Sequence, residues 1–350
     1  MPNLENLRES IVRWVTAGED YSQLDPTYHL SEARHFHHPG TCEWIFDHPS
    51  FKLWDDTKSD SVLWYHGPPG CGKTIMSCVV AESLRRNGRQ VIWFPCYFYD
   101  SARSQALNAF RFIALQLLRR TQIIPDAVQK IYEEECANYR SKLTYHETLK
   151  MVVHELLMIT ERIHIIIDGL DECAPARRER LHRQNDFINA PARNDGEVML
   201  EMIRWLVQPP AKRRGMTKWF FSSRREGSIE STMTPLKAIT ISPSAGSLQR
   251  DITKFLSETL KANNACTCRI PQLAAAADGN FQYAAHKANT LRGIGSTSHD
   301  EIEEELWDFP VGLTNLYIKS LDKLSSRSEN EQELARCVPT LPCPLALNSI

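Results

Sequence analysis

The feature that most restricts how this chain can fold is the glycine-rich run HGPPGCGKT, residues 66–74, which directly follows the apolar run VLWY. The run matches the spacing G-x-x-x-x-G-K-[ST]. Its glycines permit backbone angles that a Cβ forbids, so successive N–H groups can turn inward around an anion. Apolar residues at helical spacing follow over residues 75–84. A strand, a glycine loop and a helix in this order predict a phosphate loop.

The residue types in the loop suit the binding of a nucleotide and its metal. The main-chain amides would surround phosphate oxygens, Lys73 would bring a mobile charge to the outer phosphates, and Thr74 would offer its hydroxyl to Mg²⁺. The start of the following helix adds a dipole that favours an anion. The predicted nucleotide-binding residues are Gly67, Pro68, Pro69, Gly70, Cys71, Gly72, Lys73 and Thr74.

A second segment, RIHIIIDGLDEC at residues 162–173, supplies carboxylates. Its β-branched run predicts a strand that is buried on both faces of a parallel sheet. Asp168 is the first charged residue at the carboxyl end of that strand, where open α/β sheets bind ligands, and is predicted to hold Mg²⁺. Asp171 or Glu172 would orient the attacking water or take its proton. Taken alone, this acidic stretch could also be the first turn of a helix.

A third segment, MTKWFFSSRREGSIES, reads as a strand over residues 217–222 that ends in two arginines. Arg224 would distinguish a triphosphate from a diphosphate, because guanidinium contacts to the last phosphate exist in only one of those states. The alternative is a basic turn exposed to water.

The order GPPGCGKT, IIIDGLDEC, FFSSRRE resembles the NACHT-type nucleotide-binding domain of the STAND class of P-loop ATPases. The form it resembles is the nephrocystin-like one that is abundant in filamentous fungi. The acidic pair Asp171-Glu172 after Asp168-Gly169 is the most specific mark, and the likeness extends over roughly residues 10–330.

The resemblance implies roles for the same residues. Gly67 to Thr74 would bind the phosphates of ATP or GTP, with Asp168 on the Mg²⁺ side. Asp171 or Glu172 would be the hydrolysis carboxylate and Arg224 the sensor arginine. Gly40 and Thr41 would lie near the base.

The chain departs from the family pattern in two places. The lid turn of many relatives is Gly-x-Pro, whereas this chain has Gly279-Asn280-Phe281. The tail ARCVPTLPCPLALNSI contains prolines that would break the helix expected there, which suggests truncation before the winged-helix segment.

The predicted fold class is α/β, a P-loop NTPase with a parallel sheet flanked by helices and followed by a smaller helical lid domain. The predicted domains are an N-terminal helix and polar linker (1–40), the NTPase core (41–245) with a mobile loop at about 174–196, the helical lid (246–328) and an irregular tail (329–350). The expected strands begin at Ser61 and span 90–98, 163–168, 217–222 and 237–241; the expected helices span 8–18, 104–120, 147–162, 248–263, 271–292, 299–307 and 311–325.

Composition narrows the range of partners. A net charge of −2 gives no general attraction to nucleic acid, and no apolar run is long enough to span a bilayer. The N-terminus does not have the pattern of a signal peptide. Ten cysteines without framework spacing fit reduced thiols in a cytoplasmic protein. Cys266-x-Cys268 and the histidines of HFHH, residues 35–38, are not expected to bind metal.

The expected function is a nucleotide-binding signalling switch, in which slow hydrolysis would reset conformation and self-association. By the resemblance, such switches act in responses like innate immunity; the signalling partner is not indicated. Two alternatives stay open: a scaffold that binds nucleotide without turnover, and a P-loop phosphotransferase.

Overall fold

A computed structural model describes residues 4–18, 22, 25–98, 100–173, 195–208, 215–261 and 269–293. Within these ranges the chain forms two compact units. Of the described residues, those within 4–36, 46–66 and 73–241 form the sheet unit, and those within 37–45, 67–72 and 242–293 form the helical unit. The predicted mobile loop falls outside the described residues, apart from Asp195 and Gly196, which begin a helix instead. The helices predicted at 299–307 and 311–325 also lie outside them.

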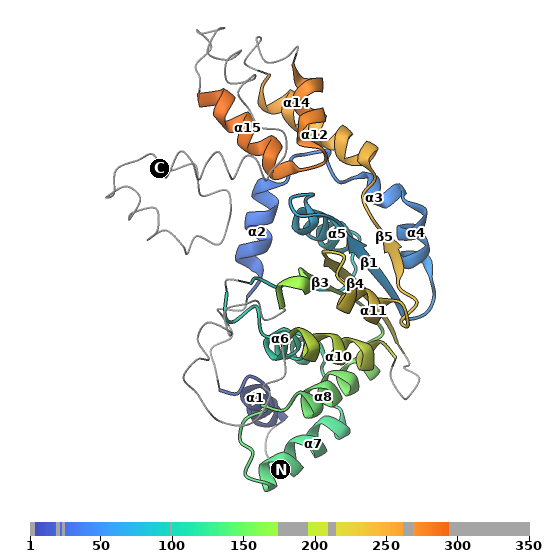
Figure 1. The fold of residues 1–350 in the computed structure, drawn as a ribbon. Helices are drawn as coiled ribbons and strands as arrows, with labels where there is room; N and C mark the ends of the chain where they lie inside the picture. Colours follow the sequence, from blue (N-terminus) through green and yellow to red (C-terminus); the bar gives the residue numbers. More distant parts are fainter. Residues whose placement is uncertain are drawn as a thin grey trace, which may run out of the picture. The chain divides into compact units, whose positions relative to one another are not determined.

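The sheet unit is built on five parallel strands in the order β2-β3-β4-β1-β5 (Figure 1). The strands are β1 (Ser61–His66), β2 (Val91–Pro95), β3 (Arg162–Asp168), β4 (Met216–Ser223) and β5 (Ile239–Ile241). The predicted α/β class with a parallel sheet is confirmed. The strands are apolar on both faces because helices cover each side, as parallel crossovers require.

Helices cover the two faces of the sheet in separate groups. One face carries α6 (Ala106–Arg120), α8 (His146–Met158) and α10 (Asp195–Val207), with α1 (Leu4–Val15) and α7 (Asp126–Ala137) packed beyond them. The other face carries α4 (Pro49–Asp56) and α5 (Lys73–Arg86), with α2 (Thr27–Phe36) against α5. The remaining short elements are α3 (Trp44–Asp47), η2 (Leu170–Cys173) and α11 (Gly227–Met233).

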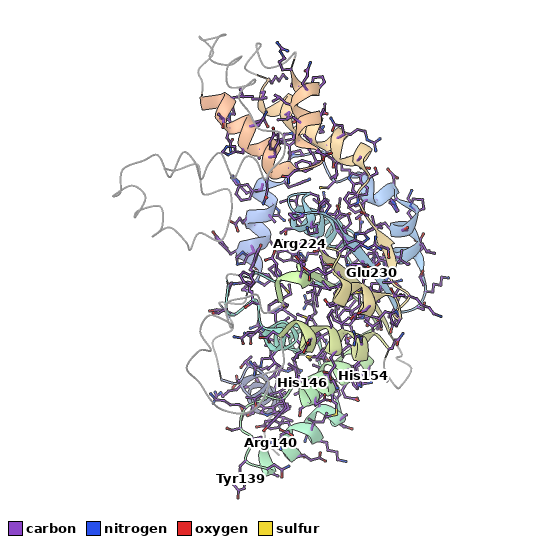
Figure 2. The ribbon with its side chains drawn as sticks, in the orientation of Figure 1. Tyr139, Arg140, His146, His154, Arg224 and Glu230 are labelled. Carbon is purple, nitrogen blue, oxygen red and sulfur yellow. The ribbon has the colours of Figure 1, made fainter. Side chains whose placement is uncertain are left out.

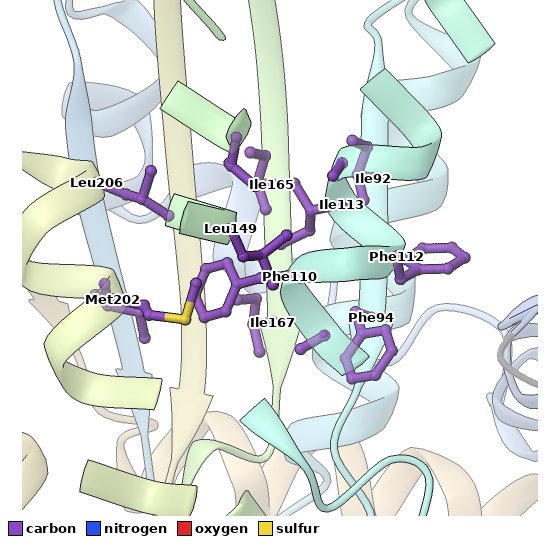
Figure 3. Packing of buried hydrophobic residues seen from close by; sticks show 14 of the residues in the cluster. Ile92, Phe94, Phe110, Phe112, Ile113, Leu149, Ile165, Ile167, Met202 and Leu206 are labelled. Atoms are coloured by element: carbon purple, nitrogen blue, oxygen red, sulfur yellow. The ribbon is translucent and has the colours of Figure 1, made fainter. Parts of the chain in front are cut away.

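Alternate strand residues pack against these two groups. Ile165 and Ile167 of β3 meet Phe110 and Leu149 on the α6–α8 side (Figure 3). On the other side, the indole of Trp93 in β2 donates to the Ser77 hydroxyl of α5 at 3.0 Å. The strand period of two therefore divides one apolar sheet between two cores.

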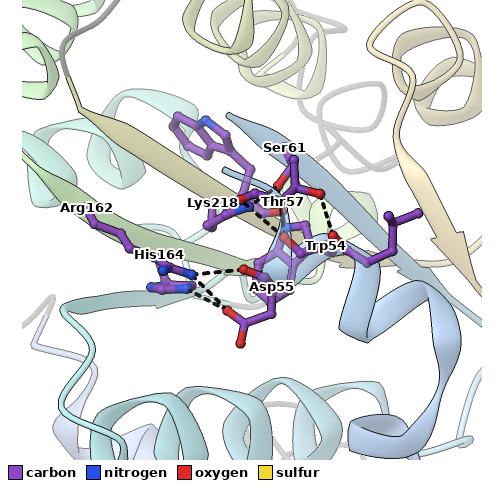
Figure 4. A network of polar contacts seen from close by, with 9 residues as sticks. Trp54, Asp55, Thr57, Ser61, Arg162, His164 and Lys218 are labelled. Carbon is purple, nitrogen blue, oxygen red and sulfur yellow. Dashed lines mark hydrogen bonds and ion pairs between the residues drawn. The ribbon is translucent and has the colours of Figure 1, made fainter. Parts of the chain in front are cut away.

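The amino edge of the sheet, where the strands begin, buries a charged network (Figure 4). The Lys218 ammonium is fully buried and donates to Trp54 O at 2.7 Å, to Ser61 Oγ at 3.0 Å and to Thr57 O. Burial lowers the pKa of Lys218 to about 8. This network fixes the end of α4 and the turn after it to the start of β4.

The helical unit contains α12 (Ala245–Thr259), α14 (Ile270–Ala277) and α15 (Phe281–Gly293). The single helix predicted at 271–292 is wrong. The chain breaks at Asp278 (φ 45°) and Gly279 (φ 77°), both in the left-handed region that ends helices. The Asn280 side chain then accepts from the Tyr283 N–H at 2.9 Å, which caps the second helix.

Several helices of the sheet unit were not predicted, among them α2, α7 and α10, and one predicted helix was displaced. The polar stretch before residue 41 contains α2, which buries only Leu30 and Ala33. α7 was likewise missed, and the helix expected at 8–18 spans 4–15, with Ile11, Trp14 and Val15 buried as expected. Among the described residues, no helix is long and apolar enough to cross a bilayer.

Candidate functional site

Asp168 stands at the carboxyl end of β3 and is the most buried acid of the candidate site. Its side chain is 2% exposed and accepts a hydrogen bond from the Ser222 hydroxyl of the neighbouring strand β4. The hydroxyls of Thr74 and Ser77, both on α5, favour the charged form of this carboxyl. Two residues far apart in sequence, Thr74 and Asp168, are thus brought together within the sheet unit.

The electrostatics of Asp168 suit a cation ligand. Burial raises the pKa of Asp168 above its ordinary value, while its hydroxyl partners and the charge of Lys73 act in the opposite direction. A carboxylate beside the Thr74 hydroxyl is a set of hard oxygen donors, which is the kind that Mg²⁺ prefers. These residues therefore fit the predicted metal.

Glu172 lies on η2, the short turn that follows β3. Its Oε2 accepts from the Phe98 N–H at 3.1 Å. Burial, with the nearby negative charges of Asp168 and Asp171, raises the pKa of Glu172 to about 7. A carboxylate that gains and loses a proton near neutral pH is suited to general base chemistry.

Asp171 is in a different environment from Glu172. Its Oδ1 accepts from the main-chain N–H of Arg224 at 2.9 Å, and its Oδ2 lies 3.2 Å from Arg224 Nε. The Arg224 side chain is 54% exposed, at the carboxyl end of β4 (Figure 2). The predicted sensor arginine, which is half exposed, therefore forms an ion pair with one of the two predicted hydrolysis carboxylates, which is nearly buried.

The turn between Asp168 and Cys173 is held against the end of β2. The Cys96 N–H donates to Asp168 O at 2.8 Å, and a Cβ on Gly169 would lie 3.0 Å from Cys96 O. Gly169 also has φ +73°, so a side chain there would be strained. The Cys173 and Cys96 thiols, both buried, lie 3.2 Å apart. These contacts fix the position of Glu172.

The phosphate loop itself, Gly67–Gly72, belongs to the helical unit and runs directly into Lys73, the first residue of α5. Gly70 and Gly72 have φ of +75° and +85°. A Cβ on Gly67 would lie 2.6 Å from the Cys71 thiol. The glycines are thus required by conformation at two positions and by space at the third, as expected for a backbone that wraps an anion.

Gly40, Thr41 and His38 of the histidine run at residues 35–38, which the sequence also singled out, contact other residues of the helical unit. A Cβ on Gly40, φ +76°, would meet the Lys254 side chain at 2.6 Å, and Thr41 is buried with its hydroxyl 2.7 Å from His38 O. Their place near a nucleotide base stays a prediction. His38 Nε2 lies 2.9 Å from Glu258.

With this geometry in place, comparison with known proteins decides the family. Residues 40–224, more than half of the chain, match the family model described as Nephrocystin 3, N-terminal. The chain belongs to the nephrocystin 3 N-terminal family. The NACHT-type resemblance inferred from the motifs is thereby confirmed.

One curated relative of this nephrocystin-type chain is the vegetative incompatibility protein HET-E-1 of Podospora anserina. It is 22% identical over 372 aligned positions that cover 99% of this chain and 25% of that protein. The chain thus spans about a quarter of the relative it matches. Among solved structures, the E. coli MS115-1 HORMA:CdnC:Trip13 complex contains a chain with 10% identity and a TM-score of 0.38, with 87% of both chains covered.

Several site residues of this nephrocystin-type domain were not predicted. The Ser222 hydroxyl donates to Asp168, the Phe98 N–H donates to Glu172, and Asn280 contacts the phosphate loop. A serine at the end of a strand was a visible signal for Ser222. The other contacts could not be read from the sequence, because they depend on the strand order and on the break between α14 and α15.

Proposed function

We propose that this chain is an ATP-binding, slowly hydrolysing signalling switch. The observation that carries the proposal is the cluster at the start of α5 and the end of β3, where Asp168, the Thr74 hydroxyl and the Lys73 charge come together. A buried carboxylate next to the last residues of a phosphate loop is the arrangement that metal–triphosphate binding requires.

The binding step follows from the loop and the helix after it. The amides of Gly67–Gly72 would bind phosphate oxygens, and Lys73 would neutralise the outer phosphates. Mg²⁺, when bound, would neutralise further phosphate charge, and Thr74 and Asp168 are the residues that would hold it. ATP and GTP share these phosphates, so the preference for ATP rests on the family likeness.

In the hydrolytic step, Glu172 is better placed than Asp171 to act as the base. Asp171 is engaged by Arg224 through both its oxygens. Glu172 has one oxygen on the Phe98 N–H and a pKa of about 7, so its carboxylate can accept the proton of an attacking water at neutral pH.

The switching step would use the Asp171–Arg224 pair. Because Arg224 is more than half exposed, its guanidinium can leave Asp171 for a phosphate, while Asp171 keeps its bond to the Arg224 main-chain N–H. Arg224 would then contact Asp171 in one nucleotide state and phosphate in the other, which shifts the population of two conformations. Self-association and signalling are proposed from the resemblance of the motifs to NACHT-type domains of the STAND class.

The test compares three variants of the purified chain in nucleotide-binding and phosphate-release assays. Lys73→Ala should abolish ATP binding, whereas Lys130→Ala, which changes an exposed lysine of α7, should bind as the wild type does. Glu172→Gln should bind ATP and lose turnover. Equal ATP affinity in the wild type and Lys73→Ala would overturn the proposal. Tight binding without phosphate release in the wild type would instead favour the scaffold alternative.

A further inference from the structure

The turn that joins α14 to α15 holds the phosphate loop by two hydrogen bonds. Asn280 Nδ2 donates to Pro69 O at 3.2 Å, and the Phe281 N–H donates to Gly70 O at 2.8 Å. All four residues lie within the helical unit. Two successive carbonyl groups of the loop are therefore bound from one side.

The planarity of the peptide bond gives these two contacts a consequence for anion binding. The described peptide bonds are trans, so the C=O and N–H of one peptide group point in opposite directions. Bonding the carbonyls of Pro69 and Gly70 to the α15 turn directs the N–H groups of Gly70 and Cys71 away from it. The Cys71 N–H donates to Pro68 O within the loop at 3.4 Å.

We propose that Asn280 and the Phe281 N–H form a brace that presets the phosphate-binding amides of the loop. Asn280 is then a positioning residue, which acts on the nucleotide through Pro69 rather than by touching it. The inference rests on the proposed function, since it concerns the loop proposed to bind phosphate, and it adds a named mechanical link between that loop and α15.

The Asn280 side chain is held by hydrogen bonds at both its amide oxygen and its amide nitrogen. Its Oδ1 accepts from the Tyr283 N–H at 2.9 Å, which caps α15, while its Nδ2 reaches the loop. A Cβ on Gly70 would lie 2.5 Å from the Asn280 amide, so only glycine leaves room for it. On the preceding side, a Cβ on Gly279 would come within 2.9 Å of Leu248. The turn therefore has little freedom to place this amide elsewhere.

Phe281 contributes a donor that proline in its place would lack. As the first residue of α15, its N–H has no partner within the helix, and Gly70 O supplies one. Its ring packs near that of Phe255, with centroids 6.4 Å apart. The main-chain and side-chain roles of Phe281 can therefore be separated by mutation.

The brace also makes the coupling reciprocal. Phosphate binding that reorients the loop carbonyls would strain or release the hydrogen bonds to Asn280 and Phe281. If phosphate binding shifts the equilibrium between the made and broken bonds by some factor, breaking those bonds by a displacement of α15 changes the phosphate affinity of the loop by the same factor. The start of α15 would thus respond to nucleotide without contacting it.

The first experiment separates the brace from the helix cap at Asn280. Asn280→Ser keeps an oxygen for the Tyr283 N–H but cannot reach Pro69, whereas Asn280→Ala loses both contacts. Both variants should bind nucleotide about threefold to tenfold more weakly, as expected for one lost hydrogen bond. Amide exchange over residues 67–74 should accelerate in the nucleotide-free protein, and only Asn280→Ala should also lower the unfolding temperature.

The second experiment isolates the Phe281 N–H. Phe281→Pro removes the N–H at a helix position that proline tolerates, and Phe281→Ala keeps the N–H while removing the ring. The proline variant should bind nucleotide about threefold to tenfold more weakly than the alanine variant. Wild-type affinity and wild-type loop exchange in both Asn280→Ser and Phe281→Pro would overturn the brace. Absence of nucleotide binding by the wild type would overturn the proposed function instead, and the exchange data would still decide the brace.

Discussion

The two ends of the β3–β4 pair each bury a charged side chain, and the hydrogen-bond partners of that side chain differ between the two ends. At the amino edge, the Lys218 ammonium donates to two carbonyl oxygens and one hydroxyl, so each of its three protons has an acceptor. At the carboxyl edge, Asp168 accepts from the Ser222 hydroxyl, and the hydroxyls of Thr74 and Ser77 and the charge of Lys73 also favour its charged form.

This contrast separates a structural charge from a ligand-binding one. Two of the oxygens around Lys218 are main-chain carbonyls at the end of α4 and the third is the Ser61 hydroxyl of β1, so the network joins these elements to β4 and is complete without a ligand. The hydroxyls around Asp168 can rotate, and each can turn its proton elsewhere while its oxygen faces a cation. The amino edge should therefore govern stability, and the carboxyl edge should govern nucleotide binding.

The largest expected effect on stability is at the amino edge. Lys218→Met would leave the carbonyls of Trp54 and Thr57 buried without their donor, which should lower the free energy of unfolding by about 2–4 kcal/mol. Chemical denaturation measures this change. Lys52→Met, at an exposed lysine of α4, is the control and should stay within about 0.5 kcal/mol of the wild type. A change of that small size in Lys218→Met would show that the network is not structural.

The pH dependence of stability should differ between the edges. The folded-state pKa of Glu172 is raised from 4.5 to about 7, so the folded state holds more protons than the unfolded state between these values. Glu172 should therefore make stability fall as pH rises from 4.5 to 7, by at most about 1.4 kcal/mol per pH unit. Denaturation of the nucleotide-free protein across this range should show that Glu172→Gln lacks the decrease. An identical pH profile for both proteins would contradict the assigned environment.

At the amino edge the sign is reversed. The folded-state pKa of Lys218 is lowered from 10.5 to about 8, so the unfolded state holds more protons and stability should rise as pH increases through this window. The stability difference between the wild type and Lys218→Met should therefore change from pH 8 to 10.5, again by at most about 1.4 kcal/mol per pH unit. A difference that is constant with pH would mean that Lys218 titrates normally.

The smallest expected effect on stability is at Arg224. The Arg224 side chain is 54% exposed and the Asp171 carboxylate also accepts from the Arg224 main-chain N–H, a bond that Arg224→Gln keeps, so this variant should change the free energy of unfolding by less than about 1 kcal/mol. The same variant should reduce the difference between triphosphate and diphosphate affinities, measured by competition binding. Unaltered discrimination between the two nucleotides would remove Arg224 from the switch.

The carboxyl edge could be predicted from the sequence far better than the amino edge. The phosphate loop and Asp168 are local patterns, a glycine spacing and an acid that ends an apolar run. Lys218, in contrast, occupies a strand position whose burial depends on where α4 ends. The Ser222–Asp168 contact similarly depends on strand order, which a sequence shows only indirectly.

The break between α14 and α15 illustrates a second limit. The run from residue 271 to 292 is rich in alanine and favours helix almost throughout, so local propensity predicts one helix. The bonds from Asn280 and Phe281 to the phosphate loop stabilise the break instead. α2 was missed for the opposite reason, because only Leu30 and Ala33 are buried and the apolar period is weak.

The most direct test of the contrast between the amino and carboxyl edges of the sheet is the Mg²⁺-dependent binding of ATP. Calorimetry measures it for two variants, one from each edge. Asp168→Asn, which keeps the shape and removes the charge, should weaken Mg²⁺-dependent binding by about 100-fold or more while leaving the nucleotide-free protein folded. Lys218→Met should retain wild-type affinity under conditions where it is folded, despite its lower stability. Equal affinities in Asp168→Asn and the wild type, or equal losses in both variants, would contradict the account.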